Sequence, residues 1–586
     1  MFGKIVYISD NLAHVKIAEG TPIATNLMNL HVVFEDDNKK ILGEVADIST
    51  DIIKIRFLGE IVNGRFVGGV IRKPTLSARL RIVNKEEVAM IIGNETPGSF
   101  LLGVSSLYDD YPIHVDINNL FSNHMAIFGN SGSGKSYGVA RILQNIFLNK
   151  KVIPFKANFF IFDAYGEYHN AFSTLNQINP NFNFKIYSTN PNQPNAEMLK
   201  IPLWLLGVDE LALLLSADEH GQLPIIERAL KLVKVFADNN EQSEALKNHL
   251  IAKAIMTILY TNQTSASKRN DIFSILATCS TEKFNLEAPV QGIGYVRKFR
   301  ECFTIDSAGN FTDLILVTEY ISKFINEDAE KYIPSGTKPY TLEELEKALE
   351  FTLISEGLLR NEKTFNNAIT LKVRLHTIAI GEYAKYFKVN NYISKENFIA
   401  SLVAMNGKKA QIINFNLEDV DDWFAKFVTK TFTKMFFDFT KSLKNRASVP
   451  IHVFLEEAHR YVQKDNDVYL LGYNIFERVA KEGRKYGMLL NLISQRPVEI
   501  SETVISQCSN FLIFKMNHPR DLEYIRQMLP NISAEIVEKQ KSLQPGTCVA
   551  FGRAFKVPLI VKMQLPNPEP HSSNADVVDK WTVKQG

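Results

Sequence analysis

Apolar and polar residues alternate in short runs over the first part of the chain. The runs richest in β-branched and aromatic residues span 4–8, 13–17, 42–45 and 52–57. Turn-forming residues separate them, including Asp36-Asp37-Asn38 and the hairpin dipeptide Asn63-Gly64. Many short strands at this spacing predict a small β-barrel over residues 1–88, with a β-sandwich as the alternative.

From about residue 118 the pattern changes to continuous apolar runs followed by helical periodicity. Residues 124–128 lead into a glycine-rich turn and a helical pattern through Leu143, and residues 158–162 end at Asp163. Such runs are typical of strands buried on both faces of a parallel sheet. Further runs of this kind span 411–415, 451–455, 488–493 and 511–514. The chain therefore predicts an α/β fold with a parallel sheet.

The organisation of the rest follows from where these runs stop and return. The segment from about 173 to 400 favours helices, and the α/β pattern returns after about 409. The polar, proline-rich end from Leu565 onward is typical of an extended tail. We predict a barrel at 1–88, the first part of an α/β core at 89–172, a helical insertion at 173–400, the second part of the core at 401–562, and a tail at 563–586.

Composition narrows the class of protein but does not decide its function. Apolar residues make up 45% and charged residues 22%, as in an ordinary globular protein. The 66 basic and 64 acidic residues leave a formal charge of +2, which argues against a histone-like surface but permits a local basic patch. The four cysteines lack zinc-site spacing, and no run predicts a signal peptide or a membrane span. We expect a soluble, cytoplasmic protein.

A complete phosphate-binding loop follows the run at 124–128. Its residues are Gly129, Asn130, Ser131, Gly132, Ser133, Gly134, Lys135 and Ser136. In this pattern glycines turn backbone amides toward phosphates, the lysine reaches the terminal phosphates and the last hydroxyl binds Mg²⁺. A flexible Gly/Ser loop can match by accident, but a buried strand before it and a helix after it favour ATP and Mg²⁺ binding.

Paired carboxylates end the apolar run at 451–455. Acidic pairs on exposed helices are usually only solvated, whereas Glu456 and Glu457 follow a strand that is predicted to be buried. We expect Glu456 to hold Mg²⁺ through water and Glu457 to polarise the attacking water. A glutamate at the magnesium position is one carbon longer than the more familiar aspartate.

Two further residues are candidates for the same site. Gln495 follows the run at 488–493 and can sense the γ-phosphate, although an isolated glutamine here would usually be an ordinary loop residue. Arg484 precedes that run and can act on the site of a neighbouring subunit, as trans-acting arginines do. The alternative for Arg484 is an arginine at a helix C-terminus, where it interacts favourably with the helix dipole.

Taken together in order, these motifs resemble the HerA family of ATPases. The matching segments are 132–136, Asp163-Ala-Tyr-Gly-Glu-Tyr168, Glu456-Glu-Ala-His-Arg460, Gly483-Arg-Lys-Tyr-Gly487, Ser494-Gln-Arg-Pro497 and Phe551-Gly-Arg-Ala554. The first strands and the segment 201–206 are also similar to that family. One departure is Ala164-Tyr165, where the family usually has Pro-His in positions that we expect to shape a turn.

The resemblance implies a RecA-like P-loop ATPase core with a parallel sheet, an N-terminal small β-barrel and a large helical insertion. It also implies a homohexameric ring on double-stranded DNA, with ATP sites between subunits. The implied partner is an effector such as a NurA-type nuclease or a sirtuin-like NAD hydrolase, in DNA end processing or antiphage (antiviral) defence.

Other functions stay open at the level of sequence. A nucleotide-regulated scaffold that switches a partner enzyme without substantial translocation is the main alternative to a DNA translocase. A conjugation or secretion ATPase is disfavoured by the lack of a predicted membrane span. A DEAH-box helicase is disfavoured by the long stretch between Lys135 and Glu456.

Overall fold

The computed structural model describes residues 2–18, 27–36, 39–238, 240–332, 338–355, 362–528 and 540–571, together with residues 577 and 581. The chain divides into two compact units. The first contains residues 1–197, 401–465 and 474–586, and the second contains residues 198–400 and 466–473. Each unit is described by itself below.

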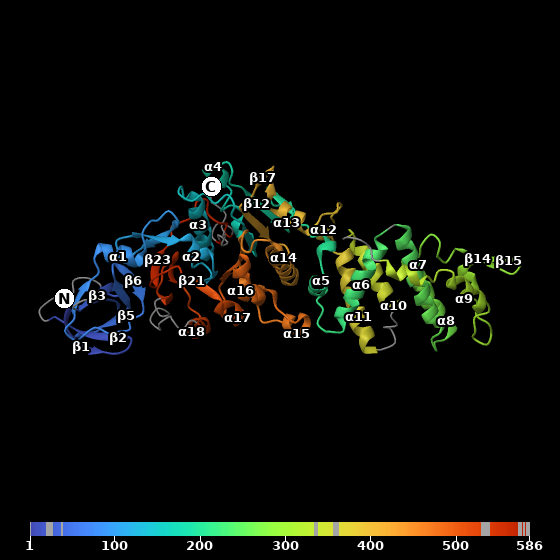
Figure 1. The fold of residues 1–586 in the computed structure, drawn as a ribbon, viewed down its shortest axis with the longest axis horizontal. Coiled ribbons are helices and arrows are strands. Elements are labelled where there is room, and N and C mark those ends of the chain that lie inside the picture. Colours follow the sequence, from blue (N-terminus) through green and yellow to red (C-terminus); the bar gives the residue numbers. More distant parts are fainter. Residues whose placement is uncertain are drawn as a thin grey trace. The chain divides into compact units, whose positions relative to one another are not determined.

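The N-terminal part of the first unit is a curled antiparallel sheet that forms a half-barrel (Figure 1). Its strands are β1 (Phe2–Ile8), β2 (Leu12–Ile17), β3 (His31–Asp36), β4 (Lys39–Ile48), β5 (Ile52–Val62), β6 (Arg65–Gly68) and β7 (Arg79–Ile82), in the order β1-β2-β5-β4-β3-β7 with β6 beside β5. Alternate residues such as Ile53 and Ile55 are fully buried in one apolar cluster. The antiparallel barrel architecture expected from the sequence is confirmed.

The rest of the first unit is built on one twelve-stranded sheet. Its order is β13 (Ala196–Met198), β12 (Phe184–Ser188), β18 (Ile412–Asn416), β11 (Phe159–Asp163), β19 (Ile451–Leu455), β20 (Met488–Ser494), β10 (His124–Phe128), β21 (Cys508–Phe514), β22 (Thr547–Gly552), β23 (Leu559–Lys562), β8 (Ser99–Ser105) and β9 (Tyr111–Asp116). The strands from β12 to β21 pair in parallel, and those from β21 to β9 pair antiparallel. The predicted parallel sheet is therefore present.

Helices cover this sheet on both faces because successive strand side chains point in opposite directions. In β11, Phe159 and Ile161 pack in the same apolar cluster as residues of α3 (Lys135–Leu148). Phe160 and Phe162 instead contact the rings of Phe436 and Phe432 on α14 (Asp422–Ser442). α14 also packs against α16 (Ile475–Tyr486), and both contact β20.

The short helices of the first unit cap or connect these strands. They are α1 (Lys85–Ile92), α2 (Ile117–Phe121), α4 (Leu175–Ile178), α17 (Glu502–Ser506) and α18 (Pro519–Met528), with the 3₁₀ turns η1 (Glu167–His169), η6 (Ala458–Arg460) and η7 (Pro497–Glu499). Two of these turns, η1 and η6, follow the C-terminal ends of β11 and β19. They therefore lie where ligands bind in open parallel sheets.

The second unit is mainly helical, as the sequence predicts. Its helices are α5 (Val208–Leu214), α6 (Gln222–Phe236), α7 (Glu241–Leu259), α8 (Ser265–Cys279), α9 (Leu314–Ser322), α10 (Leu342–Ser355), α11 (Glu362–Ile380), α12 (Ala384–Phe387), most of α13 (Lys395–Val403) and α15 (Asp467–Leu471). α10 contacts α6, α7, α8 and α11, which gather around it (Figure 1). A hairpin of β14 (Pro289–Gly292) and β15 (Tyr295–Lys298) completes the unit.

The boundaries of the helical unit differ from the predicted insertion at 173–400. Residues 173–197 belong to the first unit, because β12 pairs in parallel with β18 in the core sheet. Residues 466–473, which lie between β19 and α16, belong to the second unit, where the Tyr473 hydroxyl donates to Asp209 Oδ2 at 2.6 Å. A strand of five residues is too short for its hydrophobic pattern to be told apart from that of a helix when the surrounding sequence is helical.

Two other predictions concern the ends of the chain and the membrane. Residues 563–571 of the predicted tail are packed on the first unit, and the tail beyond 571 lies outside the described residues except at 577 and 581. Residues 37–38 of the predicted turn also lie outside them. Among the residues that the structure describes, no helix is both long and apolar enough to cross a membrane.

Close packing of α3 on the sheet makes Gly138 a sensitive position. A Cβ added there would lie 2.6 Å from Cζ of Phe514, whose ring is fully buried. Overpacking costs about 1–3 kcal/mol, and alanine gains about 1 kcal/mol over glycine in a helix. We expect Gly138→Ala to lower the free energy of unfolding by about 1 kcal/mol and Tm by about 2–4 °C.

Scanning calorimetry measures this shift, and Gly68→Ala is the matched control because a Cβ added at Gly68 would have no atom within 4 Å. An unchanged Tm in Gly138→Ala would show that Phe514 can move aside.

Candidate nucleotide-binding and catalytic site

The phosphate-binding loop at residues 129–136 is held rigidly between β10 and α3. Gly132 and Gly134 have φ angles of 70° and 100°, a left-handed region that favours glycine. The Asn130 amide donates to the Lys515 carbonyl at 2.9 Å, and the Gly546 amide donates to the Ser133 carbonyl at 2.9 Å. Neighbouring segments of the sheet thus fix the shape of the loop.

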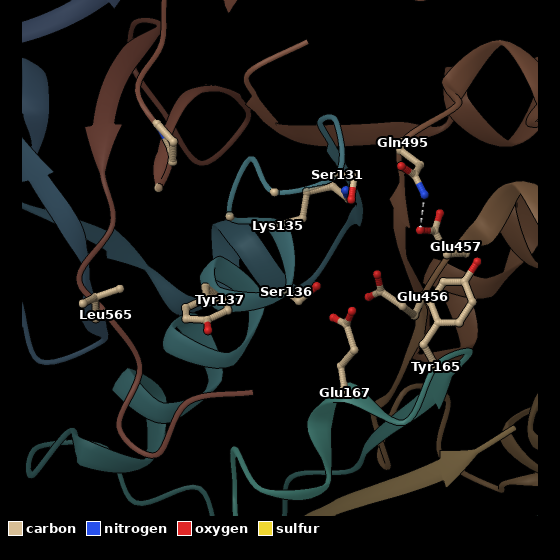
Figure 2. A pocket seen from close by; sticks show the side chains of 14 residues that line it. Ser131, Lys135, Ser136, Tyr137, Tyr165, Glu167, Glu456, Glu457, Gln495 and Leu565 are labelled. Carbon is tan, nitrogen blue, oxygen red and sulfur yellow. Dashed lines mark hydrogen bonds between the residues drawn. The ribbon is translucent and has the colours of Figure 1, made fainter. Parts of the chain in front are cut away.

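A cavity of about 530 Å³ opens in front of this loop (Figure 2). Its lining residues are Ser131, Gly132, Gly134, Lys135, Ser136, Tyr137, Tyr165, Glu167, Glu456, Glu457, Gln495, Pro545, Gly546 and Leu565. The structure therefore brings together Lys135, Ser136 and the three candidates that follow β19 and β20. The other loop residues, Gly129, Asn130 and Ser133, do not line the cavity but contribute to the shape of the loop. The Ser133 hydroxyl donates to the Asn130 carbonyl at 2.7 Å.

Strand order explains why these side chains converge. β20 lies between β10, which leads into the loop, and β19, whose last residue Leu455 directly precedes Glu456. All three strands are parallel, so their C-terminal ends meet at one edge of the sheet. Gln495 therefore lies beside Glu457 at this edge of the sheet, and Lys135 Nζ donates to the Asn130 carbonyl at 3.0 Å.

Glu457 is held in a strained, oriented position. Its φ of 49° is uncommon for a residue with a side chain, and such strain is maintained chiefly at functional sites. Gln495 Nε2 donates to Glu457 Oε1 at 2.6 Å, as Figure 2 shows, and His459 Nδ1 lies 3.2 Å from Oε2. Burial opposes ionisation of Glu457, but His459, Lys135 and the Gln495 hydrogen bond outweigh it and lower its pKa. Glu457 is the ionised member of the pair.

Glu456 is in the opposite electrostatic state. It is almost completely buried, and burial together with repulsion from Glu457 and Glu167 raises its pKa well above the usual value. Lys135 and the Tyr168 hydroxyl, which donates to Glu456 Oε2 at 2.7 Å, only partly offset this effect. A nearby cation would stabilise the charged form of Glu456.

The turn after β11 supplies residues that were not assigned a role from sequence. Asp163 is fully buried and accepts hydrogen bonds from the amides of Glu167 and Tyr168 at 3.0 and 2.9 Å and from Asn414 Nδ2 at 3.1 Å. Burial raises the pKa of Asp163 to about 6 against these hydrogen bonds. Asp163 thereby places Glu167 in the cavity and Tyr168 on Glu456.

Tyr165 also lines the cavity, so the expectation that positions 164 and 165 only shape a turn is incomplete. Its ring lies under the Arg460 guanidinium, 5.5 Å from the ring centroid. The sequence did signal this turn, because an acidic residue stands at the end of each apolar run: Asp163 is the last residue of β11, and Glu456 directly follows β19. The separation of Glu167 and Tyr165 from the acidic pair in sequence hid their proximity.

The oxygen atoms of the cavity fit a magnesium ion that also binds phosphate. Within the described ranges, no group of three or more His, Cys, Asp or Glu side chains could hold a metal by itself. Magnesium usually takes only one or two carboxylates and completes its shell with phosphate and water. Ser136 and Glu456 line the cavity, and Glu167 Oε2 is buried there without a hydrogen-bond partner among the described residues. These donors suit a hard cation.

Arg484 is not brought into this cavity. It is exposed in the last turn of α16, which leads into the N-terminal end of β20, whereas the cavity lies at the C-terminal end. Its Nη1 lies 3.5 Å from Asn123 Oδ1, just before β10 begins. Arg484 therefore does not contribute to the site of its own chain.

Comparisons with known proteins agree with this arrangement. The family described as "Helicase HerA, central domain" matches residues 102–287. A probable helicase of Methanocaldococcus jannaschii is 24% identical over 94% of this chain and 81% of its own length. The DNA double-strand break repair helicase HerA of Sulfolobus acidocaldarius is 22% identical over 94% of this chain and 91% of its own length.

Among solved structures, VirB4 of Thermoanaerobacter pseudethanolicus aligns with a TM-score of 0.44 and 13% identity, covering 80% of this chain and 97% of that chain. The phosphate-binding loop, the parallel sheet and the acidic strand end together define a P-loop ATPase. Relatives named as helicases also match nearly the whole chain, so the chain is similar to the HerA family of ATPases over most of its length.

The geometry of Glu457 gives a first test of the site. We expect Glu457→Gln to retain ATP binding but to lose hydrolysis by about 100-fold or more, since an amide cannot accept a proton from water at neutral pH. Lys135→Ala should lose hydrolysis because the terminal phosphates lose their cationic partner. Radiolabelled turnover and filter binding separate the two effects.

Glu502→Gln is the matched control, because Glu502 pairs with exposed Lys464 and does not line the cavity. Hydrolysis at the wild-type rate in Glu457→Gln would remove Glu457 from the catalytic role.

Proposed function

We propose that this chain is an ATP-driven DNA translocase, a helicase-like motor that hydrolyses ATP at the subunit interfaces of a ring. The observation that supports this best is the convergence of Lys135, Glu457 and Gln495 on one cavity in a chain similar to the HerA family. One relative, aligned with this chain over 91% of its own length, is named as a DNA double-strand break repair helicase. An intact hydrolytic site is what such a motor requires.

The chemistry proposed for the site follows from its geometry. Lys135 and the amides of the loop bind the β- and γ-phosphates, while Ser136 would ligate Mg²⁺ and Glu456 would hold it through water. Held there, the ion would supply positive charge to stabilise the charge that develops on the phosphate oxygens. Glu457, kept ionised and oriented by Gln495 and His459, accepts the proton of the attacking water. Glu167 Oε2 faces the same cavity and can orient a water of the magnesium shell.

The ring and its partner are part of the same proposal. We infer a homohexamer in which Arg484, exposed and outside the cavity of its own chain, reaches the γ-phosphate in a neighbouring subunit. The proposed partner is an effector such as a NurA-type nuclease or a sirtuin-like NAD hydrolase. Such a pair would act in DNA end processing or in antiviral defence within the cytoplasm.

Mixed assemblies test Arg484. Arg484→Ala should be inactive alone, because each site then lacks its arginine, yet it still carries a normal phosphate-binding loop. Mixing it with Lys135→Ala subunits should recover part of the ATPase activity at interfaces that combine one intact loop with one intact arginine.

Lys485→Ala is the control for a lost charge, since Lys485 is the exposed neighbour on the same helix turn. The absence of recovery in assemblies that native mass spectrometry shows to be mixed would contradict the assignment in trans.

A nucleotide-regulated scaffold is the second candidate function. A scaffold would use nucleotide binding to assemble and switch its partner, without moving along DNA. The near-neutral charge of +2 keeps this candidate open, because no global basic surface provides DNA binding. The strained Glu457 and its two orienting partners favour turnover over binding alone.

DNA dependence separates the motor from the scaffold. We expect duplex DNA to raise ATP turnover, and this stimulation to fall steeply with salt because several phosphate contacts release several counterions. The wild type should displace a protein roadblock from duplex DNA only with hydrolysable ATP. ATPase rates across a salt series and a roadblock-displacement assay measure both effects.

Glu457→Gln provides the decisive control in the roadblock assay. A roadblock that stays in place at every salt concentration, while Glu457→Gln still supports full activity of the partner, would favour the scaffold and rule out the motor.

A further inference from the structure

The segment after β23 is not a free tail but a strap docked beside the cavity. We define the strap as residues 564–571. Arg141 Nη2 donates to Gln564 Oε1 at 2.6 Å, and the Tyr137 hydroxyl donates to Glu569 Oε2 at 3.1 Å. At its end, the His571 amide donates to the Glu167 carbonyl at 2.7 Å. The strap therefore runs along α3 and reaches the turn that carries Glu167.

One buried side chain fixes the middle of the strap. Gln144 is 3% exposed, and its Nε2 donates to the carbonyls of Ala171 and Pro568, each at 2.8 Å. Its Oε1 accepts from the Asn567 amide at 2.9 Å. A buried amide that satisfies the strap backbone in both directions stabilises one register, because slippage would leave buried polar groups unpaired.

This register places Leu565 in an unusual position. Leu565 is 70% exposed although it lies on a segment anchored on both sides, and it lines the cavity together with Tyr137, Pro545 and Gly546. Figure 2 shows Leu565 and Tyr137 on one side of Lys135, with Glu456, Glu457 and Gln495 on the other. The cavity thus has an acidic end and an apolar end, with the phosphate-binding loop between them.

We propose that the apolar end binds the nucleobase, with Leu565 of the strap and Tyr137 as its main contacts. The γ-phosphate must lie near Glu457, where water is activated, so the phosphate chain extends along the loop toward Tyr137 and Leu565. Covering a flat base gives the exposed leucine an apolar partner. This assignment rests on the proposed ATPase function of the same cavity.

The lining also predicts what the base site can distinguish. The Tyr137 hydroxyl already bonds Glu569, and the Gly546 amide and carbonyl are used by Ser133 and by the Met563 amide at 2.8 Å. Pro545 has no amide hydrogen. The side chains of Leu565 and Pro545 offer a base only apolar contact, so adenine and guanine should bind alike, and the smaller pyrimidines should bind less well.

Steady-state kinetics on the full-length protein test the site. We expect Leu565→Ser to raise KM for ATP by about 3- to 10-fold, the effect of losing part of a buried leucine contact. The value of kcat should stay unchanged, because the base is bound equally in the ground and transition states. Ile153→Ser is the matched control and should retain the wild-type KM, because Ile153 is 52% exposed and does not line the cavity. In the wild type, KM for GTP should lie within about 3-fold of that for ATP.

A photolabelling experiment provides a readout that a merely structural role would not give. Irradiation of the wild type with 8-azido-ATP should label the peptide that contains Leu565 or the one that contains Tyr137, as identified by mass spectrometry. Excess ATP should prevent the labelling. Label confined to other peptides would overturn the assignment.

Two kinetic outcomes would also overturn it: an unchanged KM in Leu565→Ser, or a fall in kcat at constant KM, which would place the strap at the catalytic end. Failure of the proposed function is distinct, because the wild type itself would then not hydrolyse ATP. A wild type that hydrolyses ATP normally beside an unaffected Leu565→Ser would reject only the base site.

Discussion

The burial of two adjacent carboxylates at the end of β19 is the constraint on which the site depends. Both Glu456 and Glu457 are less than 5% exposed, and two like charges taken out of water together are costly. The structure separates their states instead of ionising both. Glu457 has a lowered pKa beside His459 and Gln495, while Glu456 has a raised pKa and shares a hydrogen bond with Tyr168. The surroundings thus favour the charged form of Glu457 and disfavour the charged form of Glu456.

This separation explains why the turn after β11 is built around another buried acid. Asp163 orders the amides of Glu167 and Tyr168, and Tyr168 in turn orients Glu456. The chain of contacts runs from β18 through Asn414 to the cavity, so the neighbouring strand also fixes the site. A third carboxylate, Glu167, adds repulsion that raises the pKa of Glu456 further. The acidic end of the cavity is thus arranged for a cation before any is bound.

The parts predictable from sequence were those whose signal is local. The phosphate-binding loop occupies eight consecutive residues, and the strands before Lys135 and Glu456 are continuous apolar runs, so both elements followed from the pattern, while the roles of their residues stay predictions. The order of the strands in the sheet could not be predicted, because it depends on contacts between segments far apart in sequence. β20 inserts between β10 and β19 and brings Gln495 to the acidic pair. The short β12 and the contributions of Tyr165 and Glu167 were missed, because a five-residue strand and single polar residues carry no period of their own. Whether Arg484 acts in trans stays a prediction, since it depends on a neighbouring subunit.

The acidic end and the apolar end of the cavity are therefore built from different parts of the structure. The acidic end comes from strand termini, whose positions are set by the sheet and tolerate little displacement, because proton transfer needs hydrogen-bond geometry. The apolar end comes from a strap more than 400 residues away from Tyr137 in sequence, held chiefly by Gln144 and by contacts at its edges. Apolar contact with a base is not directional, so it requires only that the Leu565 side chain stay against the flat face of the base. A docked chain end is sufficient for that purpose, whereas it would not be sufficient for catalysis. The site can thus combine a rigid catalytic end with a base contact supplied by a segment that a sequence pattern describes only as a tail.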